Sequence, residues 1–128
     1  MDKRFLSRGK RTDDKGWVYG FYCTWFDENG GTVHTINRPA EGKNIATIID
    51  PDTVCQCTGV TDKNGTYIYE KDIVTDPVGT LHIVTLWLGE WVITHGENWV
   101  RKYNLSRNYN YITVFGNTVD NPELWERI

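Results

Sequence analysis

The longest hydrophobic pattern in the chain lies at residues 17–26, where WVYGFYCTWF has aromatic or apolar side chains at most positions. As a strand, it would place one set on one face (Trp17, Tyr19, Phe21, Cys23, Trp25) and a second set on the other (Val18, Tyr22, Phe26). A strand that is apolar on both faces is usually covered on both, by a loop or by another subunit. A stacking platform for bases is the alternative, although no basic residues alternate with these aromatic ones.

Shorter apolar runs separated by turn residues predict further strands. We expect them at residues 32–36, 45–49, 67–74, 80–88, 91–95 and 111–116. The turns between them are rich in Asp and Gly, at residues 13–16, 27–31, 62–65 and 76–79. Residues 37–44, with Pro39 inside, are expected to form an exposed loop, and residues 97–109 fit neither helix nor strand clearly.

Two short helical segments are predicted from their first residues. Asp50 can cap a helical turn that begins at Pro51, and Asn121 can cap a closing helix that begins at Pro122. The pattern as a whole indicates a mainly β protein. The meander over residues 67–95 is typical of a small antiparallel barrel.

The 128 residues are enough for a single domain. We expect it to contain a β-rich N-terminal lobe, residues 1–53, and a barrel lobe with the closing helix, residues 54–128. No apolar run is long enough to span a membrane or to serve as a signal peptide, so we expect a cytoplasmic protein without a membrane partner.

Charge argues against a general nucleic-acid binder, because 14 basic and 17 acidic residues leave a net charge of −3. The basic residues do gather near the N-terminus, at Arg4, Arg8, Lys10 and Arg11. Nucleic-acid contact through these four side chains is therefore an alternative, although it is not favoured.

Metal binding is not expected either. Cys23, Cys55 and Cys57 lack the spacing of a zinc site, even when His34, His82 and His95 are considered with them. We predict reduced, partly buried thiols and no cofactor. A single strand histidine is more often a packed or surface residue than a catalytic base.

The stretch from Gln56 to Val74 is the most informative part of the chain. Asp62-Lys63-Asn64-Gly65 suits a hairpin turn in which the Asp62 carboxylate accepts backbone amides and Gly65 takes a positive φ. A bend is expected near Lys71, with the Asp72 carboxylate holding its amides. The competing interpretation is a metal-dependent enzyme that uses Asp62, Glu70 and Asp72. We favour turn formation, since Asp and Asn are the residues that turns require.

Three ordered segments resemble a known family. They are RGKR followed by WVYG at residues 8–20, the Gln56–Val74 stretch preceded by DPDTV, and VFGN with NPEL at residues 114–124. In this order and spacing the chain resembles the YopX-like proteins of bacteriophages and prophages. The residues that carry the resemblance as structural motif positions are Gln56, Thr58, Gly59, Asp62, Asn64, Gly65, Tyr69, Glu70, Asp72, Gly116, Asn117, Asn121 and Pro122.

The resemblance implies a β-rich N-terminal lobe, an SH3-like small barrel in the C-terminal half, and a phage origin. It implies no established activity and no catalytic residues. The chain departs from the family pattern at Lys71, where glycine is usual, and this puts a positive-φ bend there in doubt. It departs also at Cys55 and Cys57, where glycine and an aromatic residue are common.

We therefore expect a phage accessory protein without enzymatic activity, acting as a β module that binds a partner and self-associates. The expected partners are a second copy of the chain and an unidentified phage or host protein. Self-association is favoured because six tryptophans and seven tyrosines are many to bury within one short chain.

Overall fold

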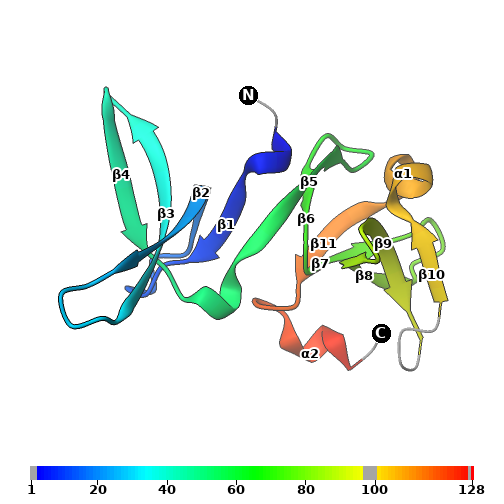
Figure 1. The fold of residues 1–128 in the computed structure, drawn as a ribbon. Helices are drawn as coiled ribbons and strands as arrows, with labels where there is room; N and C mark the ends of the chain where they lie inside the picture. The colour runs from blue at the N-terminus through cyan, green and yellow to red at the C-terminus, as the bar shows by residue number, and fades with distance from the viewer. Residues whose placement is uncertain (1–2, 97–100, 127) are drawn as a thin grey trace. The chain divides into compact units, whose positions relative to one another are not determined.

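The computed structural model describes residues 3–96, 101–126 and 128 (Figure 1). The chain forms two compact units, Met1–Cys57 and Thr58–Ile128, whereas the sequence placed the division of the lobes between residues 53 and 54. Antiparallel strands make up most of both units and the helices are short, which confirms the mainly β class. No helix among the described residues is long and apolar enough to cross a membrane.

The first unit is an antiparallel sheet with strand order β4-β3-β2-β1-β5. Its strands are β1 (Ser7–Lys10), β2 (Trp17–Phe26), β3 (Thr32–Ala40), β4 (Lys43–Ile48) and the start of β5 (Cys55–Thr61). Two 3₁₀ turns, η1 (Lys3–Phe5) and η2 (Pro51–Thr53), complete it. The Asp50 carboxylate caps η2 by accepting the Asp52 amide at 3.0 Å, as its sequence position predicts.

Strand β2 changes its hydrogen-bonding partner midway along its length. Its pairing with β1 ends at Gly20, and its pairing with β3 begins at Phe21, which lies opposite Asn37. A Cβ atom at Gly20 would lie 2.3 Å from the Asn37 carbonyl oxygen. Glycine is therefore required where the two pairings meet, because the backbones approach too closely for any side chain.

The prediction of an exposed loop at residues 37–44 is wrong. Strand β3 extends to Ala40, and β4 returns from Lys43 after a two-residue turn at Glu41 and Gly42, both with positive φ. The strand tolerates Pro39 because the pairing of β3 with β2 ends at Asn37, so Pro39 occupies an edge position on that side.

Among the described residues, one face of this sheet has a buried apolar cluster. Val18, Ile36 and Ile49 form the cluster, with Val54 packed against it. Tyr22 and Phe26 share that side of β2 but are exposed.

The strand registers place Tyr19, Trp25 and Ile48 on the opposite face, where 49%, 50% and 56% of their surface is exposed. Thr35 and Asn37 on the same face are buried. Part of this second face, at Tyr19, Trp25 and Ile48, is therefore uncovered within this unit.

The second unit is built on a five-stranded antiparallel sheet of order β10-β9-β8-β7-β11. Its elements are the end of β5, β6 (Tyr67–Tyr69), β7 (Asp72–Thr75), β8 (Leu81–Trp87), β9 (Glu90–His95), β10 (Arg101–Asn104), α1 (Leu105–Asn108), η4 (Tyr109–Tyr111), β11 (Thr113–Asn117) and α2 (Pro122–Trp125). The ambiguous segment 97–109 thus contains β10 and α1, and its first four residues, Trp99 included, lie outside the described residues. The second unit is mainly β, as expected, and its five-stranded sheet is antiparallel. The described residues do not form the closed sheet of an SH3-like barrel.

The core of the second unit is larger than that of the first. Six buried side chains form one cluster: Ile68, Val74, Val84, Ile93, Leu105 and Ile112. A second cluster joins Ile73 and Ile83 to Leu124 of α2. Through Leu124, the closing helix is packed against the sheet.

Candidate functional site

Three hairpin turns in the two units share one hydrogen-bond pattern, which begins at Asp27, Asp62 and Asp76. In each turn the aspartate Oδ1 accepts the amides two and four residues further on, at 2.7–3.0 Å. In each, the amide of a positive-φ glycine donates to the aspartate carbonyl oxygen. The sequence D-x-x-G thus adopts the same local turn at three places, whereas the D-x-x-G at residues 13–16 forms a different turn, closed by the Arg11 amide on the Gly16 carbonyl.

The second carboxylate oxygen distinguishes the three turns. Asp62 Oδ2 accepts the Val114 amide of β11 at 2.9 Å, and Asp76 Oδ2 lies 3.1 Å from His82 Nε2 of β8. The bond to Val114 joins the β5–β6 turn to a strand 52 residues away in sequence, and the Asp62 side chain that makes it is only 5% exposed. In Asp27 only the Oδ1 contacts are found among the described residues.

The bend near Lys71 is present, and the doubt about it was misplaced. Lys71 has φ 70° although it is not glycine. Its amide donates to the Val84 carbonyl at 2.9 Å, and its own carbonyl accepts the Thr118 amide at the same distance. These two backbone bonds hold a conformation that glycine would adopt without strain.

Two of the three candidate metal-binding carboxylates, Asp62 and Asp72, have positions that suit a structural role. Asp72 is 1% exposed and its Oδ2 accepts the Tyr69 amide at 2.8 Å, so it holds the bend next to Glu70 and Lys71. Asp62 binds three backbone amides. Within residues 3–96, 101–126 and 128, no group of three or more His, Cys, Asp or Glu side chains is arranged to hold a metal ion.

The family residues at the start of the Gln56–Val74 stretch lie in β5, and one of them, Thr58, also binds backbone. Thr58 donates its hydroxyl to the Ile68 carbonyl at 2.8 Å and so ties β5 to β6, while Gln56 is exposed and Gly59 has φ 86°.

The family residues near the closing helix form a compact turn. The Asn117 Oδ1 accepts the amides of Val119 and Asp120 at 3.0 and 2.8 Å. Asn121 does not cap α2 with its side chain as expected; its Oδ1 instead accepts the Asn117 amide at 3.2 Å. A Cβ at Gly116 would lie 2.4 Å from this oxygen, which explains the glycine there, and Pro122 occupies the first helical position.

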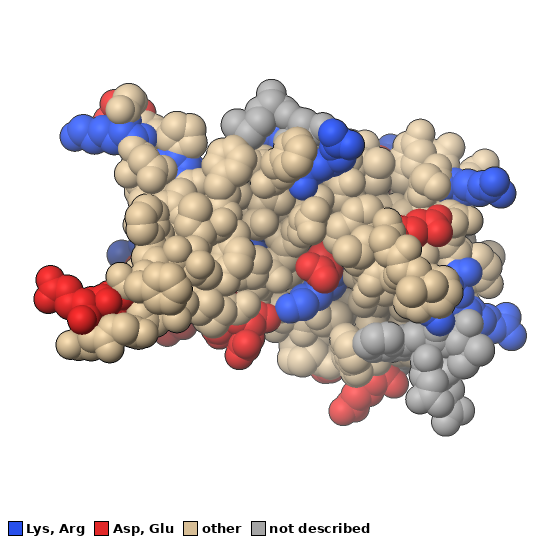
Figure 2. Space-filling view, in the orientation of Figure 1, with Lys and Arg blue, Asp and Glu red and all other residues tan. Residues whose placement is uncertain are grey.

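The basic N-terminal side chains contact neighbours in the first unit. Arg8 is 7% exposed, with its guanidinium carbon 4.5 Å from the centre of the Trp17 ring, and the Lys10 ammonium lies 5.2 Å from the same ring. Arg4 lies over Phe5, and Arg11 forms an ion pair with Asp13 at 2.7 Å. The face shown in Figure 2 has scattered Lys and Arg side chains and no broad basic patch.

The three cysteines lie in the first unit, and no disulfide joins them. Cys55 and Cys57 are buried, whereas Cys23 is partly exposed.

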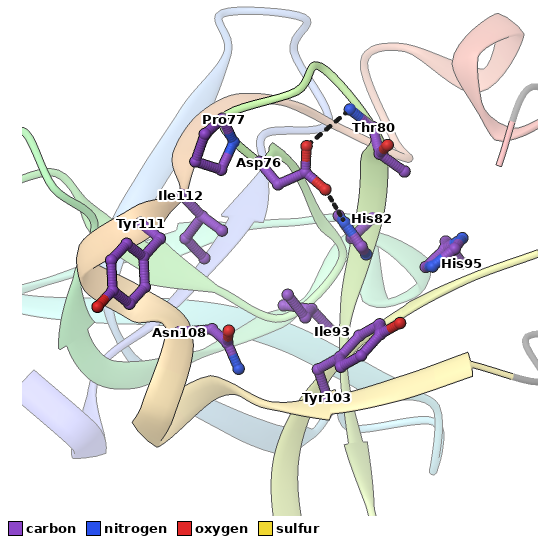
Figure 3. Close-up of a pocket in the computed structure, with 10 residues that line it drawn as sticks. All are labelled: Asp76, Pro77, Thr80, His82, Ile93, His95, Tyr103, Asn108, Tyr111 and Ile112. Carbon is purple, nitrogen blue, oxygen red and sulfur yellow. Dashed lines mark hydrogen bonds and ion pairs between the residues drawn. The ribbon is translucent and has the colours of Figure 1, made fainter.

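The clearest recess in the second unit is a pocket of about 310 Å³ (Figure 3). Asp76, His82, His95 and Tyr103 supply its polar and aromatic groups, and Ile93 and Ile112, both buried, belong to the apolar core beneath it. The remaining lining residues are Pro77, Thr80, Asn108 and Tyr111. The lining residues as a whole come from the β7–β8 turn, from β8, β9 and β10, and from the segment that follows β10.

The two histidines and the tyrosine form an aromatic group. The rings of His82 and His95 meet edge to face with centroids 4.7 Å apart, and those of His95 and Tyr103 stack at 5.9 Å. His82 is 3% exposed, with Nε2 directed at Asp76, and its Nδ1 has no hydrogen-bond partner among the described residues. Asp76 thus fixes the His82 ring, which in turn packs against His95.

Two pKa values are displaced in this pocket. Burial alone would raise the pKa of Asp76, but hydrogen bonds from His82 and from the Thr80 and Val78 amides outweigh it and lower that pKa. Burial lowers the pKa of His95, as do the charges of His82 and Arg101, against a smaller opposite effect of Asp76. Asp76 is therefore held ionised and His95 is held neutral near pH 7.

His82 itself is not placed to act as a general base. A general base must present a nitrogen to the substrate, whereas His82 directs one nitrogen at Asp76 and buries the other. The pocket contains no serine or cysteine that could act as a nucleophile beside the pair.

Sequence reasoning missed this pocket. His82 and His95 were treated as single strand residues, and Asp76 only as a turn former. The D-x-x-G turn followed by a histidine six positions after its aspartate was the available local signal. The contribution of Tyr103 depends on the pairing of β10 with β9, which the sequence pattern did not reveal.

Two compact antiparallel β units with D-x-x-G turns define the class of protein, and comparison with known proteins identifies its family. The YopX protein family model matches residues 7–126, so the chain belongs to the YopX family. This confirms the resemblance found in the sequence. Among curated proteins, none matches the chain.

Two solved structures are similar over nearly the whole chain. Protein EF1440 from Enterococcus faecalis shares 22% identity, with a TM-score of 0.53, and the match covers 92% of this chain and 95% of that one. Protein yopX from Bacillus subtilis shares 18% identity, with a TM-score of 0.56 and coverage of 94% and 98%. At these identities, the likeness shows the fold alone.

Proposed function

We propose that this protein is a non-catalytic binding module of phage or prophage origin that self-associates through its first unit. The observation that carries the proposal is the uncovered face of the sheet, where Tyr19, Trp25 and Ile48 are about half exposed. Exposed apolar side chains grouped on one face are typical of interaction sites, whereas isolated ones are common on any protein surface.

The edge strand supports a second copy of the chain as the partner. Strand β4 ends the sheet order, with β3 as its strand partner among the described residues, and all its residues except Thr47 are exposed. On its outer side the Ile48 carbonyl accepts the Thr12 amide at 3.4 Å, which leaves the rest of the strand as the open edge. An open edge is a ready template for another strand. Antiparallel pairing of two β4 strands about a two-fold axis would place each Lys43 at the far end of the other strand, which avoids like-charge contact.

The positions of the acidic residues support a protein without enzymatic activity. Asp62 and Asp72 direct carboxylate oxygens at backbone amides, and the Asp76–His82 pair lacks a nitrogen directed at a ligand. We propose that the second unit, expected from the family resemblance to be an SH3-like barrel, is the stable scaffold. The unidentified phage or host partner would then bind to the self-associated form.

Sedimentation velocity over about a hundredfold range of protein concentration tests the proposal, because mass action makes an oligomer depend on concentration. We expect the wild type to self-associate and Ile48→Asp to remain monomeric with unchanged circular dichroism. Leu88→Asp is the matched control, since Leu88 is an 83% exposed apolar residue of the second unit. A wild type that is monomeric throughout, or an equal effect of both variants, would overturn the proposal.

A further inference from the structure

A second pocket, of about 350 Å³, lies in the first unit and is lined by basic and aromatic residues. Arg11, Lys15 and Arg38 supply three positive side chains, and Trp17, Val18 and Tyr19 of β2 complete the lining. Val18 belongs to the buried cluster of this unit, so part of the pocket wall is held by the core.

The partner change of β2 explains why these residues meet. Residues 17–20 of β2 pair with β1, while the β2–β3 pairing ends at Phe21 and Asn37. Arg38 therefore comes directly after the last β2–β3 pair, where β3 no longer continues along β2. The pocket lining combines residues from both strands at this point with the turn that joins β1 to β2.

The β1–β2 turn is held in place by Asp13. The Arg11 amide donates to the Gly16 carbonyl at 2.9 Å, and Asp13 Oδ1 accepts the Lys15 amide at 3.2 Å. The same carboxylate receives Arg11 Nε at 3.0 Å and Nη2 at 2.7 Å. Asp13 thus holds the Arg11 guanidinium and the backbone of Lys15, and it competes with any anion for Arg11.

The electrostatic balance of the pocket favours an anion. Among the described residues, its lining has three cations and no carboxylate, and Asp13 is the acidic residue that contacts one of those cations, Arg11. Arg8 and Lys10, both over the Trp17 ring, add positive charge next to it. Concentrated positive charge in a chain of net charge −3 is a local feature rather than a result of overall composition.

We infer that this pocket binds a phosphoryl group, carried either by a nucleotide or by a nucleic-acid strand. A phosphate monoester has close to two negative charges and a phosphodiester has one, and both offer several acceptor oxygens, which match two guanidinium groups and one ammonium group better than a single carboxylate does. The inference does not depend on self-association. It also differs from contact through the N-terminal segment, because Lys15 and Arg38 lie outside that segment.

Isothermal titration calorimetry of the full chain with inorganic phosphate, adenosine monophosphate and a short single-stranded oligonucleotide tests the inference. We expect saturable binding that weakens as salt rises from about 50 to about 200 mM. Binding of the mononucleotide indicates a small-molecule ligand, and binding of the oligonucleotide alone indicates a strand. Absence of binding to all three probes overturns the inference.

Three variants locate the site. Arg38→Gln and Lys15→Gln should each weaken binding about threefold to tenfold, the effect of losing one charged contact near the surface. Asp13→Asn should strengthen binding, because it frees Arg11 while its amide oxygen can still accept the Lys15 amide. Lys63→Gln, an exposed turn lysine of the second unit, is the control. An equal loss in the control, or no effect of Arg38→Gln and Asp13→Asn, would show that binding lies elsewhere.

Discussion

The two units differ in how much of their apolar surface they bury in a core. The second unit buries a six-residue cluster and a further three-residue cluster, whereas the first buries a three-residue cluster with Val54 beside it. Yet the first unit contains the longest aromatic strand, and Trp25 of that strand is 50% exposed. Hydrophobicity along a strand therefore does not by itself measure the core that the strand builds, because one face can remain for a partner.

The aspartate turns offer a second comparison between the units. Asp27 in the first unit and Asp62 in the second accept the same two amides with Oδ1. Only Asp62 adds a distant amide, that of Val114. Identical local chemistry thus gives a turn of local effect in one unit and a tertiary link in the other.

The largest expected effect comes from truncation of the second core. Ile112→Ala should lower the free energy of unfolding by about 2–5 kcal/mol, because it leaves a cavity among tightly packed neighbours. The matched variant Ile36→Ala in the first unit should cost less, since the smaller cluster around it can collapse more easily. Urea denaturation followed by circular dichroism measures both, and an equal or larger loss for Ile36→Ala would contradict the comparison.

The next largest effect is expected from removal of the turn carboxylates, which should cost more stability in the second unit than in the first. Asp62→Ala should cost about 2–3 kcal/mol, since the partly buried Val114 amide loses its acceptor along with two turn amides. Asp27→Ala in its exposed turn should cost about 1 kcal/mol or less. The same denaturation assay applies, and similar losses for the two variants would show that the link to β11 contributes little.

A smaller effect is expected at the partner change of β2. Gly20→Ala should cost about 1–3 kcal/mol, because the new methyl group would force the β2 and β3 backbones apart. Hydrogen exchange should show faster opening of amides in the first unit and little change in the β7–β8–β9 sheet. Gly9→Ala in β1 is the control, because Gly9 also lacks a positive φ and the nearest atoms to an added Cβ belong to the Ile49 side chain rather than to backbone. Slower or unchanged exchange around Gly20 would rule out the steric explanation.

The smallest effect concerns pH and the second unit alone. The pKa of His95 is lowered from its ordinary value of 6.5, so the unfolded chain binds a proton more readily than the folded one. The contribution of His95 is therefore fully present above 6.5 and is lost as the pH falls below it. Asp76 acts in the same direction below its ordinary value of 3.8.

Melting temperatures measured from about pH 7.5 to about pH 5.5 check this sign. The wild type should lose stability on acidification, and His95→Gln should lose less, because it has no group to titrate at that position. A wild type that becomes more stable at the lower pH would contradict the assignment. Asp76, His82 and Arg101 are the charged groups that act on His95.

Much of the local structure could be predicted from sequence. The turns at residues 27–31, 62–65 and 76–79 form because Asp and Gly meet the geometric demands of the turn within a few residues. The 37–44 segment was misassigned because Asn, Pro and Gly are also loop residues, and only the end of the β2–β3 pairing makes Pro39 acceptable in a strand.

The candidate sites were harder to predict than the turns. The first pocket requires β8, β9 and β10 to lie in register, and the second requires β2 to leave β3 directly before Arg38. Both depend on pairings between distant residues. The second oxygens of Asp62 and Asp76 were unpredictable for the same reason, since their partners are specified by the sheet and not by the turn.

The partly exposed thiol of Cys23 gives the uncovered sheet face a built-in chemical reporter. Cys23 lies two residues before Trp25 and therefore on the same face, while Cys55 and Cys57 are buried. A thiol-specific reagent applied to the folded chain should consequently label Cys23 first. The labelling rate would then measure directly how often that face is open to solvent, in a lysate or in a living cell, without any substitution in the protein.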